Sequence, residues 1–415
     1  MILITDDSTL ILAAVLVAIA CRQVGRVRLP IWSIMLGGAG TALLTGSIGL
    51  IAALHAINCD IMLFLFGVFI IGAAMEESGY LTHLATRIFA SQRSVKKLIF
   101  LFIFTMGAFS ALLMNDTLAI IGTPIALVLA RSCNISDRIF LLALAGAITT
   151  GSVASPIGNP QNLLIALSSG MANPFLTFPL YLAVPTLISC LILYYMVVRT
   201  IPQMPNSPSP IMQEAHIQDP KMAALCKISL ALLILLIALR ILLVSLGHTP
   251  WPGLSGIALI ASLPIIIFSR QRLVILKKVD YATLVFFIAL FILMAAVFES
   301  GAIQSAVTDN QILSIPLLIA GSLIISQIVS NVPFVALLIP MLIEAGAGDA
   351  MFLALAAGST IAGNMTILGA ASNIIIIQNA EHRGATITFM EFLRFGIPVT
   401  ILQAVVFLTW FLIIT

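Results

Sequence analysis

Apolar runs roughly 18 to 25 residues long recur along the whole chain, and each is long enough for a helix to cross a bilayer. Charged residues make up only 8% of the 415 residues, against roughly 25% in soluble domains. Backbone polar groups in lipid must be paired within the segment, and the runs are continuous rather than alternating. The sequence therefore predicts an all-α, polytopic membrane protein.

We expect about ten transmembrane helices and two re-entrant hairpins. The spans lie at about 8–21, 30–54, 61–79, 139–168, 176–198, 224–246, 253–269, 281–299, 351–379 and 395–414, and the hairpins at about 98–130 and 312–345. Because no basic region precedes it, the first run is expected to be a retained span rather than a signal peptide. The five cysteines lie far apart, so neither a metal site nor a disulfide framework is expected.

Basic residues set the expected orientation, because cytoplasmic loops of membrane proteins are enriched in Lys and Arg. With the N-terminus outside, all 19 Lys and Arg residues except Arg240 fall in cytoplasmic segments. Both ends of the first hairpin then face the cytoplasm, whereas the second hairpin enters from outside. We expect a multi-pass protein of the plasma (inner) membrane with both termini outside. The cytoplasmic set is Arg22, Arg26, Arg28, Arg87, Arg93, Lys96, Lys97, Arg131, Arg138, Arg199, Lys221, Lys227, Arg270, Arg272, Lys277, Lys278, Arg383 and Arg394.

The chain also repeats itself. The segment FLFGVFIIGAAMEESG at 64–79 aligns without a gap with FFIALFILMAAVFESG at 286–301, and IGNPQN at 157–162 aligns with LGAASN at 368–373. Chance similarity between apolar helices would not match the Glu-Ser-Gly, Gly and Asn landmarks in order. We predict a first repeat at 1–199, a cytoplasmic linker at 200–223 and a second repeat at 224–415. Five spans in each half is an odd number, so the second half is inverted, as in many secondary transporters.

Polar residues inside a membrane are costly and usually functional. The hairpin tips carry two such clusters. The first is Asn115, Asp116 and Thr117, followed by Thr123, and the second is Ser330, Asn331 and Val332. Carboxylate and amide oxygens can bind a cation, so a Na⁺ site is expected near Asn115, Asp116 and Asn331, with Asp116 carrying the coupling ion. Alternatively, the Asn-Asp pair only caps the second half-helix.

Two further clusters interrupt long apolar runs. Two prolines and two glycines in the first cluster cannot continue a helix, and unwound backbone is tolerated in lipid only where it lines a cavity. The second cluster repeats this pattern with Ser, Thr and Asn. Small-residue helix packing is the alternative, but it does not explain the carboxamides. The candidate binding residues are Gly158, Asn159, Gln161 and Asn162 in the first break and Asn364, Thr366, Gly369, Ser372 and Asn373 in the second.

At these residues the chain resembles the ion transporter superfamily, which includes citrate-type permeases, sodium–sulfate/carboxylate symporters, arsenite permeases and a class of Na⁺/H⁺ antiporters. The resemblance implies a scaffold domain, usually dimeric, and a transport domain that moves like an elevator. The symporter branch carries Ser-Asn-Thr at both hairpin tips. The acid at Asp116 departs from that pattern, which leaves proton coupling, or a cationic or neutral substrate, open.

We therefore predict a secondary active transporter of a small anionic solute, a carboxylate or an inorganic oxyanion, driven by Na⁺ or H⁺. It is expected to be a homodimer in the bilayer, with no enzymatic activity, no cofactor and no nucleic-acid partner. No Gly-x-x-x-x-Gly-Lys sequence is present, so an ATP motor is not expected. The alternatives are a Na⁺/H⁺ antiporter or arsenite efflux permease on the same scaffold and, from another class, a passive ion channel.

Overall fold

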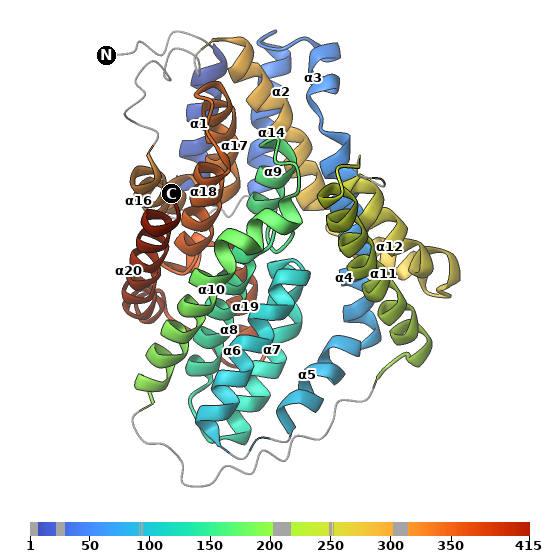
Figure 1. Ribbon diagram of the computed structural model, residues 1–415, viewed down its shortest axis with the longest axis vertical. Helices are drawn as coiled ribbons and strands as arrows, with labels where there is room; N and C mark the ends of the chain where they lie inside the picture. Colours follow the sequence, from blue (N-terminus) through green and yellow to red (C-terminus); the bar gives the residue numbers. More distant parts are fainter. Residues whose placement is uncertain are drawn as a thin grey trace.

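The computed structural model describes residues 7–21, 30–90, 92, 94–201, 217–248, 251, 253–301 and 314–415, and every regular element among them is a helix (Figure 1). The first half contains α1 (Asp7–Cys21), α2 (Ile31–Leu44), α3 (Leu50–Ala56), α4 (Cys59–Ser78), α5 (Tyr80–Ala90), α6 (Val95–Leu112), α7 (Asn115–Ser132), α8 (Asp137–Gly151), η1 (Ser152–Ala154), α9 (Pro160–Ser168) and α10 (Pro174–Arg199). The second half contains α11 (Pro220–Ser245), α12 (Leu254–Phe268), α13 (Arg272–Lys278), α14 (Tyr281–Glu299), α16 (Ile315–Val329), α17 (Asn331–Glu344), α18 (Asp349–Ala362), η2 (Ile367–Gly369), α19 (Ala371–Glu381) and α20 (Phe389–Ile414).

Seven helices in the described part of the chain are long and apolar enough to cross a membrane: α4, α6, α8 with η1, α10, α11, α14 and α20. Other predicted spans correspond to apolar helices of only 14 or 15 residues, namely α1, α2, α12 and α18. The helix α6 has the length of a span, but two lysines occupy its first turn, and the chain reverses after Leu112 into α7.

The structure corrects four predicted segments. The predicted span 30–54 is two helices, because Gly46 adopts a left-handed φ of +75° and Thr45 bonds its hydroxyl back to Thr41 O, which together end α2. The short helices α5 and α13 were not predicted, since they lie in segments assigned to loops. The last span begins at Phe389 rather than near residue 395.

The two halves repeat the same order of helices and the same contacts. In each half an antiparallel hairpin (α6–α7, α16–α17) is followed by a broken helix (α8–η1–α9, α18–η2–α19) and a long final helix (α10, α20). The hairpins lie in opposite halves of the view in Figure 1. The second arm of each hairpin packs on the broken helix of the other repeat: α7 on α19, and α17 on α9. The fold is therefore an all-helical inverted repeat, as the sequence predicted.

The remaining long helices form two mixed groups. The helices α1, α2 and α14 pack together, and we call them the α1 triplet; α11, α12 and α4 likewise form the α11 triplet. Each triplet takes two helices from one repeat and one from the other. Figure 1 shows the α11 triplet on the right, beside the hairpins and broken helices.

Part of the predicted topology lies outside the described residues. This applies to Arg22, Arg26, Arg28 and Arg93 and to most of the linker, at 202–216. The linker's final residues are described, and there the backbone N–H of Gln218 donates to Ser78 O at the end of α4. The orientation in the membrane stays a prediction.

Candidate functional site

The break in the first repeat is closed by its own side chains. Asn159, at the N-cap of α9, accepts from the Asn162 backbone N–H at 2.9 Å and donates to Ser152 Oγ at 3.0 Å. Asn162 Nδ2 donates to the carbonyl oxygens of Ser152 (3.1 Å) and Ser155 (3.0 Å). Thr360 of α18 reaches across from the second repeat and donates to Asn162 Oδ1 at 3.1 Å. Every polar side-chain atom of both asparagines therefore has a partner.

The break in the second repeat has the same geometry but unpaired oxygens. Asn373 Nδ2 donates to the carbonyl oxygens of Gly363 (2.7 Å) and Thr366 (3.1 Å). Asn331, at the tip of the second hairpin, donates to Gly369 O at 3.1 Å. The Oδ1 atoms of both asparagines are buried and have no hydrogen-bond partner among the described residues. Each retains full capacity to accept a bond or bind a cation.

More unpaired oxygens lie around the same break. Thr149 Oγ1 and Ser372 Oγ are buried without partners in the described chain. Asn364 donates to Thr150 Oγ1 (3.0 Å) and to Gln403 Oε1 of α20 (2.9 Å), while its own Oδ1 has no partner there. Gln403 also donates to Thr150 Oγ1 at 2.9 Å. The second break is thus held by neighbouring helices.

The two hairpin tips also differ: the first is hydrogen-bonded to its break, and the second has a strained backbone. The Asn115 backbone N–H donates to Gly158 O (3.1 Å), and its amide nitrogen, turned toward the same oxygen, donates at 2.9 Å. That amide also contacts Ser110 Oγ at 2.5 Å, so the first tip is joined to the first break. At the second tip Ser330 has φ = +79°, in the left-handed region that non-glycine residues rarely adopt. Such strain is found preferentially at functional sites.

Several predicted binding residues use their side chains elsewhere. Thr117 lies against α4, where a Cβ at Gly72 would come within 2.9 Å of Thr117 Oγ1. Thr123 donates to a carbonyl oxygen one turn earlier in α7 at 2.6 Å. Thr366 donates to a glutamine of α16 at 2.8 Å. Gln161 is buried in α9.

A cavity of about 530 Å³ lies between the α1 triplet and the two hairpin tips. Asp116, Ser330 and Val332 line it, which brings the predicted tip residues of both repeats together. Asp116 is half-buried and has no hydrogen bond or ion pair within the described chain. The remaining lining residues are Pro30, Ile31, Trp32, Pro160, Asp280, Ala282, Thr283, Phe286, Phe287, Ala371, Ile374, Ile375 and Gln378, without a Lys, Arg or His among these described residues.

Helix N-termini converge on this cavity. Lining residues include Asp116 in the first turn of α7, Pro160 at the start of α9, Ser330 before α17 and Ala371 at the start of α19. Three of these termini, those of α7, α17 and α19, have no side-chain cap. Each terminus carries a partial positive charge of about +0.5. The Asn115 N–H donates to Gly158 O and the Asn373 N–H to Ala370 O, and the other N–H groups of these first turns can bind a ligand. Such termini are anion sites.

The sequence analysis missed residues that matter for this geometry. Asp280 lines the cavity, but its carboxylate caps α14 by accepting from Thr283 N (3.0 Å) and Thr283 Oγ1 (2.6 Å). Gln403 is a lone carboxamide in an apolar span, so the rule that flagged the other clusters could have found it. Trp32 could not have been found, because an aromatic residue near the start of a membrane helix is usually an interfacial anchor.

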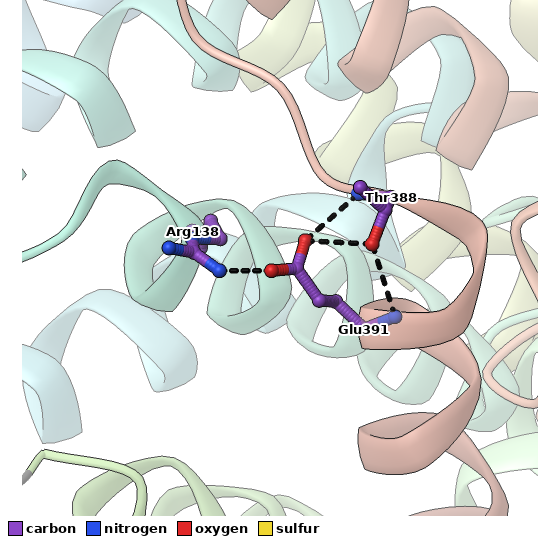
Figure 2. Close-up of polar contacts among 3 residues, drawn as sticks. All are labelled: Arg138, Thr388 and Glu391. Atoms are coloured by element: carbon purple, nitrogen blue, oxygen red, sulfur yellow. Dashed lines mark hydrogen bonds and ion pairs between the residues drawn. The ribbon is translucent and has the colours of Figure 1, made fainter.

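Basic helix ends from both repeats meet away from the cavity. Arg138, in the first turn of α8, forms an ion pair with Glu391 of α20 (Figure 2). Glu391 also accepts from Thr388 N at 3.0 Å, completing a capping box at the start of α20. On the neighbouring ends, Arg131 of α7 donates to Arg383 O after α19 at 3.1 Å. These contacts unite four helix ends that the charge pattern assigns to one side of the membrane.

Residues 11–358, most of the chain, match the citrate transporter family. The chain belongs to the citrate transporter family. This confirms the predicted resemblance to the ion transporter superfamily and makes the protein a membrane transporter rather than an enzyme.

Similar proteins agree with this assignment. The chain is 28% identical to a 46 kDa membrane protein of Mycobacterium leprae and 29% identical to an uncharacterized transporter of Mycobacterium tuberculosis; the matches cover 84% and 83% of both chains, respectively. It is 24% identical to the human P protein, over 98% of this chain and 59% of that protein.

Among solved structures, MtrF of Neisseria gonorrhoeae, described as one of a class of antimetabolite efflux pumps, has a TM-score of 0.58 at 16% identity, over 99% of this chain and 95% of that one. The YdaH transporter of Alcanivorax borkumensis has a TM-score of 0.56 at 15% identity, over 98% and 97%. These two likenesses concern the fold alone.

Proposed function

We propose that this citrate transporter family member is a secondary active transporter of a small anionic solute, driven by Na⁺ or H⁺. One observation carries the proposal: three uncapped helix N-termini, contributed by both repeats, face one cavity together with the unpaired carboxylate of Asp116. The N-termini would bind the anion. Asp116 would bind the coupling ion.

The coupling follows from charge. An ionised Asp116 in a poorly solvated cavity repels an anion bound at the neighbouring helix ends. A proton or Na⁺ on Asp116 removes that repulsion, so the ion and the solute bind together or not at all. The unpaired oxygens of Asn331 and Asn373 are a second place where Na⁺ would find neutral ligands, as hard cations prefer oxygen. The remaining predicted binding residues would shape these two positions.

The cavity also favours alternating access. Its walls come from the α1 triplet and none from the α11 triplet, whereas on the other side Thr117 is packed against α4. We propose that the hairpins and broken helices move as an elevator against the two triplets, and that the present state opens to the cytoplasm, from which α2 and α14 are predicted to enter the membrane. The homodimer, the inner-membrane location and the outside termini belong to this proposal.

The decisive test is uptake into proteoliposomes under an imposed Na⁺ or pH gradient, with citrate, dicarboxylates, sulfate and arsenite as solutes. We expect the Asp116→Asn variant to lose gradient-driven accumulation. The matched control is Asp219→Asn at the N-cap of α11, outside the cavity lining, where Asn caps as well as Asp. Unchanged dependence on pH and Na⁺ in the Asp116 variant would refute the coupling role, and conductance without accumulation would indicate a channel.

A Na⁺/H⁺ antiporter is the second candidate. It is favoured by the two carboxylates and the lack of any basic side chain among the described residues that line the cavity. Proton counter-transport driven by Na⁺ in vesicles without any organic solute would select it over the symporter.

A further inference from the structure

The cavity wall opposite the uncapped helix ends is apolar and partly aromatic. Trp32 of α2, which is 37% exposed, and Phe286 of α14 form one side. The fully buried Phe287 packs edge to face on the Phe286 ring, with 5.5 Å between the ring centroids. Ile374 and Ile375 of α19 line the cavity as well. The polar lining residues are Asp116 and Ser330 at the hairpin tips, Asp280 and Thr283 at the start of α14, and Gln378 near the end of α19. The site therefore combines polar helix starts with an apolar wall that begins one turn further along α14.

The charge of these polar helix starts limits what can bind there. Three uncapped N-termini supply together about +1.5 elementary charges. No Lys, Arg or His among the described lining residues adds to this, and Asp280 is already engaged in capping its own helix. With Asp116 neutralised by the coupling ion, the cavity compensates roughly one negative charge. A tricarboxylate would leave about two charges uncompensated and press its polar groups against aromatic rings.

We propose that the solute of this chain is a monocarboxylate, or a similar monoanion, that carries an apolar body the size of an aromatic ring. Its anionic head lies at the starts of α7, α17 and α19, and its body lies against Trp32 and Phe286. A volume of about 530 Å³ falls within the range of small-molecule sites and leaves room for a ring and a short side chain. The proposal rests on the proposed function and narrows its substrate class.

The test compares four probes that separate head group from body. Phenylacetate has both features, acetate has the head alone, benzylamine has the body with the opposite charge, and citrate has three carboxylates. Dissociation constants are measured by calorimetry on the full-length purified protein at saturating Na⁺ and at low pH. We expect phenylacetate to bind at least about tenfold more tightly than acetate and citrate, because only its ring is buried against the aromatic wall.

Substitutions of tryptophan test whether the aromatic wall of the cavity causes the preference for phenylacetate. Trp32→Ala is expected to weaken phenylacetate binding about five- to tenfold and to leave acetate unchanged, whereas Trp32→Phe restores most of the loss. Trp251→Ala is the control, since Trp251 is 77% exposed and does not line the cavity. Because the readout is a ratio between two probes on the same sample, partial misfolding of a variant does not imitate it.

Each outcome bears on one of the two proposals. Equal affinity for phenylacetate and acetate, no phenylacetate binding by folded protein, or tightest binding of citrate overturns the apolar-body inference while leaving coupled anion transport standing. Benzylamine binding more tightly than phenylacetate, with loss in Trp32→Ala, overturns the anionic solute of the proposed function itself.

Discussion

The two broken helices share a backbone design and differ in how it is held. In the first break, the N-cap residue Asn159 and its partner Asn162 satisfy the unwound turn from within. In the second, the position equivalent to Asn159 is Ala370, which caps nothing, and the turn is held by Asn373 from within and by Gln403 and Gln327 from outside. Of the equivalent asparagines Asn162 and Asn373, Asn373 is the one whose side-chain oxygen has no partner among the described residues.

This difference between the two breaks indicates that they have different roles. A buried network in which every group is paired is rigid, whereas buried oxygens without partners are costly and persist where a ligand supplies the missing bond. The first break is thus suited to hold the two repeats together through Thr360, and the second to bind an ion. Asn at 159 against Ala at 370 accounts for the missing cap, and the lack of a donor equivalent to Thr360 accounts for the unpaired Oδ1 of Asn373.

The largest effect is expected from closing the space at the first break. A Cβ at Gly151 would lie 2.3 Å from Gly107 O and Gly107 Cα, which are backbone atoms of α6 that cannot move aside. Gly151→Ala should destabilise the protein by about 3 kcal/mol through overpacking. The second break already carries Ala362 at the equivalent position. The measurement is the thermal unfolding midpoint in detergent.

Gly37→Ala is the matched control, because nothing lies within 4 Å of its Cβ position in α2. It should be neutral or stabilising by up to about 1 kcal/mol, as expected for Gly→Ala inside a helix. Equal stability of both variants would mean that α6 and α8 are not in close contact at this crossing.

The next largest effect is expected from replacing the equivalent asparagines Asn162 and Asn373, which should have different consequences. Asn162→Ala removes the bonds donated to the Ser152, Val153 and Ser155 carbonyls and the bond accepted from Thr360, so we expect a loss of about 2–3 kcal/mol in unfolding free energy. Asn373→Ala removes two donated bonds and no accepted one, and should cost about 1–2 kcal/mol. Its main effect should be a higher Na⁺ concentration for half-maximal uptake.

We therefore expect Asn162→Ala to lower mainly the stability of the protein, and Asn373→Ala to change mainly the Na⁺ dependence of uptake. Denaturant or thermal unfolding and the Na⁺ titration of uptake are measured on the same preparations. Equal effects of both variants on the Na⁺ titration would contradict the different roles of the two breaks.

Much of the fold could be predicted because long apolar runs in the sequence mark the membrane helices. The span at 281–299 has the bounds of α14, and the breaks fall where Gly and Pro in the first repeat, and Gly in the second, interrupt the pattern. The tip residues Asp116 and Ser330 do meet at one cavity. The sequence could not indicate which asparagine oxygens stay unpaired, because that depends on partners such as Thr360 that lie roughly 200 positions away. Nor could it separate Thr117 from Asp116, since only packing turns one toward α4 and the other toward the cavity.

A smaller effect is expected where the second break is held from outside. Gln403 is buried on α20 and donates to Thr150 Oγ1 while accepting from Asn364. Gln403→Leu should cost about 1–2 kcal/mol and reduce uptake, since the turn beside Asn364 loses its support. Thr400→Val, one turn away on the same helix, removes a buried hydroxyl without a described partner and should change neither quantity. Equal losses in both variants would show that α20 tolerates no change at this depth and would remove the specific role of Gln403.

The smallest predicted effect would convert the second break into a copy of the first. A Cβ at Gly363 would lie 3.1 Å from Ala370 Cβ, so these positions face each other as Ser152 and Asn159 do. In Ala370→Asn the new amide can cap α19, which is expected to stabilise the protein by about 1 kcal/mol. As the Asn159 amide donates to Thr360, the new amide would donate to its counterpart Thr149, one of the unpaired oxygens around the second break, so uptake should become less dependent on Na⁺ even though the protein is more stable. A rise in thermal midpoint combined with a flatter Na⁺ titration is the expected pair of results, whereas a stabilised variant with an unaltered titration would mean that the ion is bound elsewhere, with Asp116 as the remaining candidate.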